Sequence, residues 1–233
     1  MKCRLVVVDA RCGERVADSL RNFAEEVFLF RSDGVTYGSI SCHPDIFIYK
    51  GGGETVVAPN SPRKLLDKFD ELGIPHVKGQ SFVGDKLENS CYYNCLSTEK
   101  DFFLRDGFAD ETLLSLNASR RKVLLPQSYV RCSMLPLTDR AFITSDAGIR
   151  KALVREGYEV FLFSPKEIRI PVHAYGFLGG TCGKMGDKVI FLGNPLKHGD
   201  GADLCRFVEA HGLEVVPLAD QCLYDGGALF FFE

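Results

Sequence analysis

Residues 45–49 read Asp-Ile-Phe-Ile-Tyr, a short aromatic and β-branched stretch that is typical of a buried strand. Four later stretches have the same character, and they span residues 101–104, 140–144, 188–192 and 228–232. Their central apolar residues lie 39 to 56 positions apart along the chain. This spacing predicts five similar units of about 40–55 residues, which together fill residues 1–233 as a single domain.

A helix with recognisable ends is expected after these strands. Ser61 and Pro62 place a capping hydroxyl and a first-turn proline before a helical pattern over residues 63–72. Asp110 and Ser145 are in position to cap two later helices. A further short strand follows each helix, so each unit reads helix, strand, polar loop, strand.

The two ends of the chain predict how the units are joined. Residues 4–8 form an apolar strand with no partner in its own unit, and residues 229–232 end the chain on another strand. Pairing the two would close a ring and remove the exposed edges of an open sheet. The predicted fold is therefore a five-fold pseudosymmetric α/β propeller. The alternative is a doubly wound α/β sheet, which seldom places two strands between successive helices.

Composition and charge limit the classes of partner. The chain has 28 Lys and Arg against 31 Asp and Glu, a net charge of −3, and the charges are interspersed. This balance argues against nucleic acid or an anionic membrane surface as a partner. No stretch approaches the roughly 18 apolar residues that a membrane helix needs, so no membrane partner is expected.

The nine cysteines are odd in number and irregular in spacing, and the N-terminal apolar run is shorter than a signal-peptide core. Free thiols in a reducing cytoplasm are therefore expected. Cys91 and Cys95 have no second pair at zinc-like spacing, and the glycines before Lys184 lack the Ser or Thr of a phosphate loop. No metal and no cofactor are expected.

Three further stretches carry a family resemblance. They are His43-Pro44-Asp45-Ile46-Phe47, the sequence Gly-Phe-Leu-Gly-Gly at 176–180, and Asp-Gly-Gly at 225–227. With a five-unit ring whose polar loops meet at the centre, they resemble the pentein fold. That fold is shared by arginine and agmatine deiminases, dimethylarginine hydrolase, amidinotransferases and a non-catalytic ribosome-binding initiation factor. The stretches look most like an uncharacterised bacterial family of the same fold.

The resemblance implies a chemistry for some of these residues. In catalytic penteins a cysteine thiolate attacks the guanidinium carbon, a histidine transfers protons and carboxylates hold the cation. His43-x-Asp45 before a hydrophobic strand matches the family's His-x-Asp/Glu pattern, which implies an acid–base role for His43 and substrate binding by Asp45. The family nucleophile follows a glycine-rich turn in the last unit. Here Ala228 follows Gly227 instead of a cysteine.

Two cysteines are candidates for the missing nucleophile. Cys222 stands three residues before Asp225 in a loop that also holds a phenol and a second carboxylate. Cys182 follows the glycines at 179 and 180 and would face the centre from a neighbouring unit. Either thiol is equally consistent with a small buried side chain that only fills space.

Other polar residues occupy comparable loops. Asn94, Asp225 and His173 are expected to bind substrate, and His173 is also the second candidate proton carrier. A lone histidine in an apolar strand is, however, more often a core residue than a catalytic one. His43 and Asp45 also have structural alternatives to a catalytic role. His43 is then an ordinary loop residue, and Asp45 is a residue that forms the turn.

Two functions remain open from the sequence. The first is an enzyme that acts on C–N bonds of a small cationic guanidine or amidine, either as a hydrolase or as an amidinotransferase. The second, favoured by the missing cysteine after Gly227, is a non-catalytic pentein-like binding protein. The sequence indicates neither the substrate nor the oligomeric state.

Overall fold

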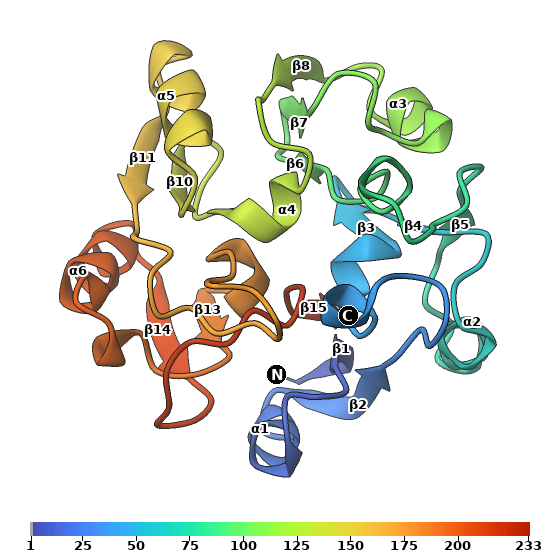
Figure 1. The fold of residues 1–233 in the computed structure, drawn as a ribbon, viewed down its shortest axis with the longest axis horizontal. Coiled ribbons are helices and arrows are strands. Elements are labelled where there is room, and N and C mark those ends of the chain that lie inside the picture. Colours follow the sequence, from blue (N-terminus) through green and yellow to red (C-terminus); the bar gives the residue numbers. More distant parts are fainter. Residues whose placement is uncertain (1) are drawn as a thin grey trace.

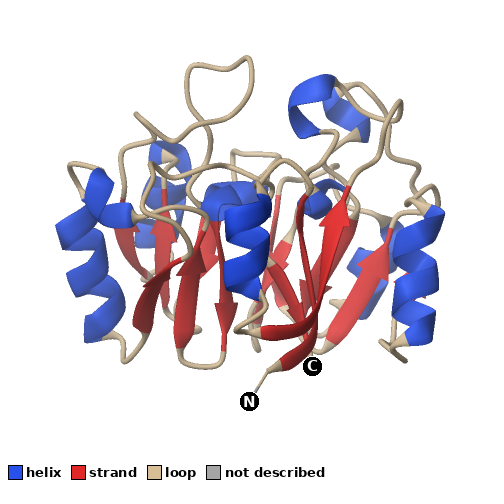
Figure 2. Ribbon diagram, turned by 90° about the horizontal axis from the view of Figure 1, so that it is seen from below, coloured by secondary structure: helices blue, strands red, loops and turns tan. Residues whose placement is uncertain are grey.

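The computed structural model describes residues 2–233, and their strands form five separate three-stranded sheets arranged around a common centre (Figure 1). Apart from the short helix over residues 130–133, which lies towards the centre (α4 in Figure 1), the α-helices lie outside the strands, and both termini lie at the same end of the molecule (Figure 2). No helix among the described residues is long and apolar enough to cross a membrane.

All five sheets follow one plan. The first strand pairs antiparallel with the middle strand, and the middle strand pairs parallel with the third. In chain order around the centre the sheets are β15 (Phe230–Phe232), β1 (Cys3–Asp9), β2 (Ala24–Phe30); β3 (Ile48–Gly51), β4 (Glu54–Val57), β5 (Val77–Lys78); β6 (Leu96–Ser97), β7 (Asp101–Leu104), β8 (Arg121–Leu124); β9 (Met134–Pro136), β10 (Ala141–Thr144), β11 (Glu159–Leu162); and β12 (Cys182–Met185), β13 (Lys188–Phe191), β14 (Glu214–Pro217).

A helix connects the middle strand of each sheet to the third, because two parallel neighbours need a crossover. The five crossover helices are α1 (Glu14–Leu20), α2 (Arg63–Glu71), α3 (Glu111–Leu116), α5 (Ala147–Arg155) and α6 (Gly201–Ala210). A further short helix, α4 (Val130–Ser133), precedes β9. The five-unit pentein-like architecture predicted from the sequence is thus confirmed, and the doubly wound sheet is excluded.

The two ends of the chain meet in one sheet. Strand β15 runs antiparallel to β1, with Leu5 opposite Phe232 and Val7 opposite Phe230. The predicted pairing of the N-terminal with the C-terminal strand is therefore confirmed.

Two of the five strands used to count the repeats are not equivalent to the others. Residues 101–104, 141–144 and 188–191 form the middle strands β7, β10 and β13. Residues 48–51 and 230–232 form the first strands β3 and β15 of their sheets. The first of these begins at Ile48, three residues later than predicted, because Pro44–Ile46 forms a 3₁₀ helix. The number of units is right, but the alignment of two of them was shifted by one strand.

Two of the three predicted helix caps are also corrected. At α2 the cap position is Pro62, and the Ser61 hydroxyl has no hydrogen-bond partner among the described residues. Asp110 caps α3 as predicted, and its carboxylate accepts from the N–H of Thr112 at 2.9 Å. At α5 the cap is Asp146, which accepts from the N–H of Ile149 at 2.8 Å. Ser145 instead accepts a hydrogen bond from the distant Leu178 N–H at 2.9 Å.

Strand β1 shows how the sheets are packed on both faces. Val6 and Val8 lie in one apolar cluster with Leu20 of α1 on the outer side. Leu5 and Val7 lie in the cluster that contains the start of the neighbouring sheet. Because alternate side chains of a strand point to opposite faces, β1 is buried on both faces, against its own helix and a neighbouring sheet on one side and against the next unit on the other.

The five segments that precede the first strands meet at the centre, and we call them the inner segments. They are residues 43–47, 92–95, 130–133, 178–181 and 225–229. Hydrogen bonds join them in sequence around the centre: Asp45 N–H donates to Gly227 O at 3.2 Å, and Gly226 N–H donates to Gly180 O at 3.1 Å. Side chains carried by these segments therefore converge although they are far apart in the sequence.

Candidate active site

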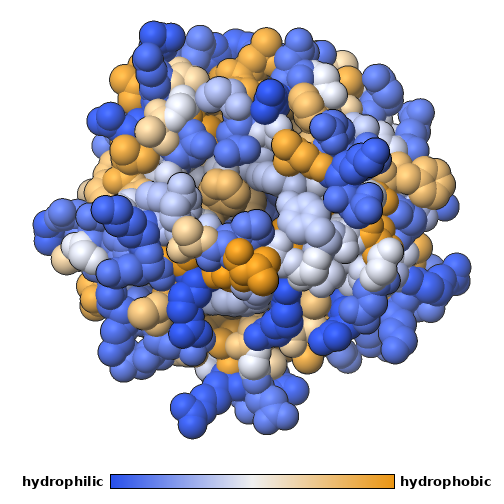
Figure 3. Space-filling model, viewed as in Figure 1, coloured by the Kyte–Doolittle hydropathy of each residue, from blue (hydrophilic) through white to orange (hydrophobic). Residues whose placement is uncertain are grey.

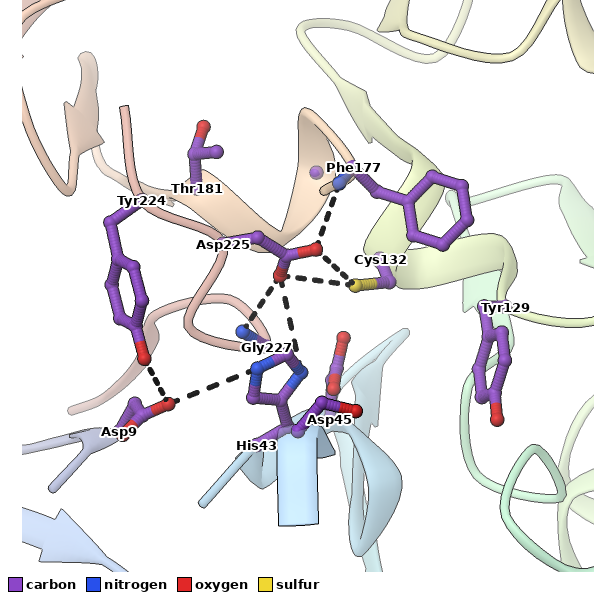
Figure 4. Close-up of polar contacts among 12 residues, drawn as sticks. Asp9, His43, Asp45, Tyr129, Cys132, Phe177, Thr181, Tyr224, Asp225 and Gly227 are labelled. Carbon is purple, nitrogen blue, oxygen red and sulfur yellow. Dashed lines mark hydrogen bonds and ion pairs between the residues drawn. The ribbon is translucent and has the colours of Figure 1, made fainter. Parts of the chain in front are cut away.

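Three reactive side chains from three inner segments converge at the centre (Figure 4). The Sγ of Cys132 lies 3.5 Å and 3.7 Å from the two carboxylate oxygens of Asp225. The Nδ1 of His43 lies 3.9 Å from Asp225 Oδ1. All three side chains are buried, and their donor atoms lie within 4.8 Å of one another.

This trio is compact enough for one small ligand group to touch all three members. Nitrogen, sulfur and oxygen are also the donor types that zinc accepts. No other group of three such side chains this close is found among residues 2–233.

Asp225 is fixed by two backbone donors. The N–H of Phe177 donates to Oδ2 at 2.8 Å, and the N–H of Gly227 donates to Oδ1 at 3.1 Å. Burial, together with the nearby charge of Asp45, nevertheless raises the pKa of Asp225 to about 7 against the lowering effect of these hydrogen bonds. The carboxyl group is therefore held in one orientation but is easily protonated.

Glycine is required at two places where backbone meets the trio. A β-carbon on Gly180 would lie 1.9 Å from Asp225 Oδ1 and 2.8 Å from the Cys132 sulfur. A β-carbon on Gly227, whose φ is +65°, would lie 2.3 Å from that of His43. These glycines permit the close approach of four inner segments.

The His43 imidazole lies between two carboxylates without a direct hydrogen bond to either. Its Nε2 is 3.8 Å from Asp9 Oδ2, while Nδ1 faces Asp225. Neither ring nitrogen has a hydrogen-bond partner among the described residues. Burial, with the positive charge of Arg11, lowers the pKa of His43 to about 3. The ring is therefore a neutral imidazole with both nitrogens available to a ligand.

Asp9 is anchored behind this imidazole. It accepts hydrogen bonds from the Arg11 N–H at 2.6 Å, the Arg11 guanidinium at 2.8 Å and the Tyr224 hydroxyl at 2.9 Å. Arg11 also donates to the carbonyl of Ser39 at 2.9 Å. This carboxylate is positioned beside His43 by groups that do not themselves line the cavity.

Asp45 is a second acidic group beneath the site. It is fully buried, neither carboxylate oxygen has a partner among the described residues, and burial raises its pKa to about 6. Asn94 holds the surrounding backbone, because its amide donates to Asp45 O at 3.2 Å and accepts from Cys132 N–H at 3.0 Å. Asn94 thus links the segment of the thiol to that of the imidazole.

The surroundings of Cys132 favour the protonated thiol. Burial raises its pKa well above the usual range, and the nearby carboxyl groups of Asp225 and Asp45 raise it further. A bound cation would lower the pKa of the thiol and of both carboxyl groups, because a positive charge favours the thiolate and the carboxylates over their protonated forms.

A cavity of about 480 Å³ opens above the trio, a volume that suits a small molecule. His43, Cys132 and Asp225 contribute to its lining. The walls are mainly apolar and aromatic: Tyr37, Ile40, Ile46, Tyr129, Ile170 and Phe177. On the same face, polar side chains dominate the periphery and less polar ones gather towards the centre (Figure 3).

The structure brings several of the predicted residues together. His43, Asp225 and His173 all line the cavity. His173 is exposed, and its Nε2 is hydrogen-bonded to the Ser39 hydroxyl at 2.9 Å. Asp45 and Asn94 lie in the inner segments next to the trio without lining the cavity.

The two predicted cysteines lie elsewhere. Cys182 is buried with its Sγ 3.5 Å from Leu178 O, and Cys222 is half-buried; neither lines the cavity. The thiol that does line it is Cys132, which the sequence analysis missed. One sequence feature could have identified Cys132: it lies in the short segment that precedes β9, the first strand of the fourth sheet, as His43 lies in the segment that precedes β3.

The comparisons with known proteins agree with this architecture. Residues 7–230 match the model of a family of unknown function, DUF6873. The chain belongs to this family. No curated protein matches the sequence.

Solved structures of guanidine-modifying enzymes share the fold of this DUF6873 protein. Agmatine deiminase from C. jejuni superposes with a TM-score of 0.60 at 7% identity, over 94% of this chain and 88% of that one. An amidinotransferase from Microseira wollei gives 0.55 at 8%, over 93% and 88%. DDAH from Pseudomonas aeruginosa, complexed with citrulline, gives 0.52 at 8%, over 93% and 92%. The protein therefore has the pentein fold.

Proposed function

We propose that this protein is an enzyme that modifies guanidines or amidines, with Cys132 as the nucleophile and His43 as the proton carrier. Asp225 and Asp45 would hold the cationic group. One observation carries the proposal: a thiol, a neutral imidazole without hydrogen-bond partners and a buried carboxyl group meet at the base of a cavity.

The electrostatics favour a cation at this place. Asp45 and Asp225 both have raised pKa values, and the Asp45 carboxyl has no cation beside it within ion-pair distance among the described residues. A planar guanidinium offers several N–H donors in one plane, which suits the Asp225 carboxylate at the base of the cavity and the unpartnered oxygens of Asp45 beneath it. Its positive charge would lower the pKa of both carboxyl groups and of the thiol.

The first half of the reaction follows from the positions of the three groups. His43 takes the proton of the Cys132 thiol, and the thiolate forms a bond to the central carbon of the guanidinium. The imidazolium then gives this proton to the departing nitrogen, and the C–N bond breaks. Ammonia or an amine leaves, and an amidino group stays on the sulfur as a cationic S-substituted isothiouronium.

The second half depends on which nucleophile enters. Water adds to the same carbon and gives one proton to His43, the S–C bond breaks, and the thiolate recovers that proton. The second proton of the water is released to solvent, where the departed ammonia or amine takes it up; the product is a neutral urea, and the reaction is a hydrolysis. An amine in place of water makes the reaction an amidino transfer. The proposal covers both outcomes, and His43 serves the same role in each.

Cys132 takes this role in preference to Cys182 and Cys222 because it alone of the nine cysteines lines the cavity. All nine are free, which supports our further proposal that the protein works in a reducing compartment such as the cytoplasm.

The second candidate function is a binding protein that holds a cation without transforming it. The observation that favours it is the raised pKa of the Cys132 thiol, which leaves little thiolate until a cation arrives. Turnover distinguishes the two functions.

The test is a panel of guanidines and amidines, assayed for ammonia, for ureido products and for amidino transfer to added amines. We expect turnover with the natural sequence and a loss of at least about 1000-fold in Cys132→Ala, because the covalent step is removed. Cys182→Ser and Cys222→Ser are the matched controls and should stay within about threefold of the natural protein. Turnover that survives Cys132→Ala, or that disappears in Cys222→Ser, would overturn the assignment of the nucleophile.

A further inference from the structure

The cavity carries opposite charges at its two ends. Asp225 is fully buried at the base, whereas Arg105 contributes to the lining from an exposed position at the mouth. Arg105 is the one residue of the lining with a permanent positive charge. Besides Cys132 and three tyrosines, the other titratable members are His43 and Asp225 at the base and the exposed His173.

Arg105 is held in place but not neutralised. Its Nη1 donates to the Ser128 hydroxyl at 3.1 Å, and its guanidinium lies over the Phe108 ring, 4.9 Å from the centroid. No carboxylate among the described residues lies within 4.0 Å of it. Most of its N–H donors are therefore free to bind a ligand.

Two other arginines near the centre show the contrast. Arg11 is paired with Asp9, and Arg131 donates to Gly179 O at 2.9 Å and to Cys182 O at 3.0 Å. Both guanidiniums are used to hold the protein together, whereas that of Arg105 is not.

Ser128 adds a second donor beside Arg105. Its hydroxyl oxygen accepts from Arg105 and also lines the cavity, and its own proton has no acceptor among the described residues. An arginine fork next to a free hydroxyl is an arrangement that suits a carboxylate.

We infer that the substrate of this site is an ω-guanidino or ω-amidino carboxylic acid, with its carboxylate bound by Arg105 and Ser128 at the mouth. The inference rests on the proposed function of the trio at the base. Between the two charged ends the lining includes Tyr37, Tyr129 and Phe177, which suit a short chain of methylene groups. A substrate with an amine at the far end would instead face the positive charge of Arg105 with no carboxylate beside it.

The test compares three ligands that share the guanidine and differ at the other end: 4-guanidinobutanoate, butylguanidine and agmatine. We expect kcat/KM to be highest for the acid and lowest for the amine, with about tenfold or more between successive members. In Arg105→Gln the preference for the acid should disappear, mainly through a higher KM for 4-guanidinobutanoate. Arg105→Lys should retain part of the preference for the acid. Arg150→Gln, an exposed arginine on α5, is the matched control.

Binding to Cys132→Ala, measured by calorimetry, separates this inference from the proposed function. Turnover without preference for the acid would overturn the inference and leave the enzyme. Absence of turnover, together with Arg105-dependent preference of Cys132→Ala for the acid, would support the ligand class and overturn the catalysis. If no ligand binds and none is turned over, both are wrong.

Discussion

The inner segments 130–133 and 225–229 face each other across the site, yet they are built differently. The first is a single helical turn that carries a thiol and no glycine. The second has two glycines and a carboxyl group, and Ala228 follows them where the resemblance to pentein enzymes leads one to expect a cysteine. Sγ and carboxylate are nevertheless 3.5 Å apart. Because all five segments end at one centre, a reactive group can enter the same site from a different segment.

The 225–229 segment also contains a residue with a strained backbone conformation. Ala228 has a φ of +71°, in the left-handed region that a side chain disfavours by about 1–2 kcal/mol. Its N–H donates to Gly180 O at 2.9 Å, which fixes the segment in this conformation. The 225–229 segment is thus strained to hold a carboxyl group in place, and the 130–133 segment supplies a thiol from regular helix.

The largest expected effect is on stability: a substitution in the 225–229 segment should change how the free energy of unfolding depends on pH, and one in the 130–133 segment should not. The folded-state pKa of Asp225 is about 7 against an ordinary 3.8, so the folded protein retains a proton that the unfolded chain loses, and stability falls as pH rises from about 4 to about 7. Asp225→Asn lacks this penalty. Its unfolding free energy relative to the natural protein should therefore increase over this range, by up to about 4 kcal/mol for three pKa units. Urea denaturation at several pH values measures it.

Cys132→Ala is the matched comparison. The thiol is uncharged below about pH 8 in both the folded and the unfolded state, so the stability difference from the natural protein should be constant from pH 4 to 7. If the free energy of unfolding of Asp225→Asn relative to the natural protein also stays constant with pH, the assignment of a buried, easily protonated carboxyl group is contradicted.

The next effect concerns the glycine between the two segments. In Gly180→Ala the new methyl group would meet Asp225 and Cys132, so the trio must separate. We expect at least about a 100-fold loss of activity, the usual cost of displacing reacting groups by about 1 Å. Gly199→Ala, where a β-carbon meets nothing within 4 Å, should be neutral. Full activity in Gly180→Ala, with the fold checked by circular dichroism, would contradict the geometry.

A smaller effect is expected in the pH profile of kcat/KM. Cation binding needs ionised carboxyl groups, and the pKa values of Asp45 and Asp225 are about 6 and about 7. The activity should therefore rise with pH up to about 7, by about tenfold per unit on its acid side, with apparent pKa values that belong to the pair. His43, whose pKa is about 3, is neutral throughout and adds no acid limb above pH 4. A profile that is flat from pH 5 to 8 would argue against this reading.

The smallest effect concerns the carboxylate behind the imidazole. Asp9→Asn should lower kcat about tenfold and leave KM nearly unchanged, because Asp9 faces His43 Nε2 and does not line the cavity. Tyr224→Phe removes only one hydrogen bond to Asp9 and should cost less than about threefold. An equal rise in KM for both variants would show instead that the cavity itself had changed.

The architecture was predictable because its causes are repeated in the sequence. Five short apolar strands with helices after them, and unpaired strands at both ends, leave few ways to bury every edge. The alignment of units was less predictable. First and middle strands of this fold are both short and buried, so Ile48 and Tyr49 look no different from Val56 and Val57.

The thiol was missed for the same reason. The sequence pattern marks this unit by residues 140–144, which form β10, and so does not indicate residues 130–133 as a central segment. Strand β9 is only Met134–Pro136, too short to show a strand pattern. The glycines at 179 and 180 were interpreted as a turn before a nucleophile, whereas Gly180 makes room for the approach of Asp225 to Cys132. That role depends on contacts between distant segments, which periodicity does not report.

The most direct measurement of the central claim is the labelling of the nine cysteines by 2-chloroacetamidine and by iodoacetamide at pH 7.5, followed by peptide mass spectrometry. Iodoacetamide has the better leaving group, but only the amidine carries the positive charge that the carboxyl groups beside Cys132 would attract. The account predicts that the amidine modifies Cys132 first, at least about tenfold faster than iodoacetamide does, and that Asp225→Asn removes this advantage. Slow and equal modification by both reagents, or a first adduct at Cys182 or Cys222, would contradict it.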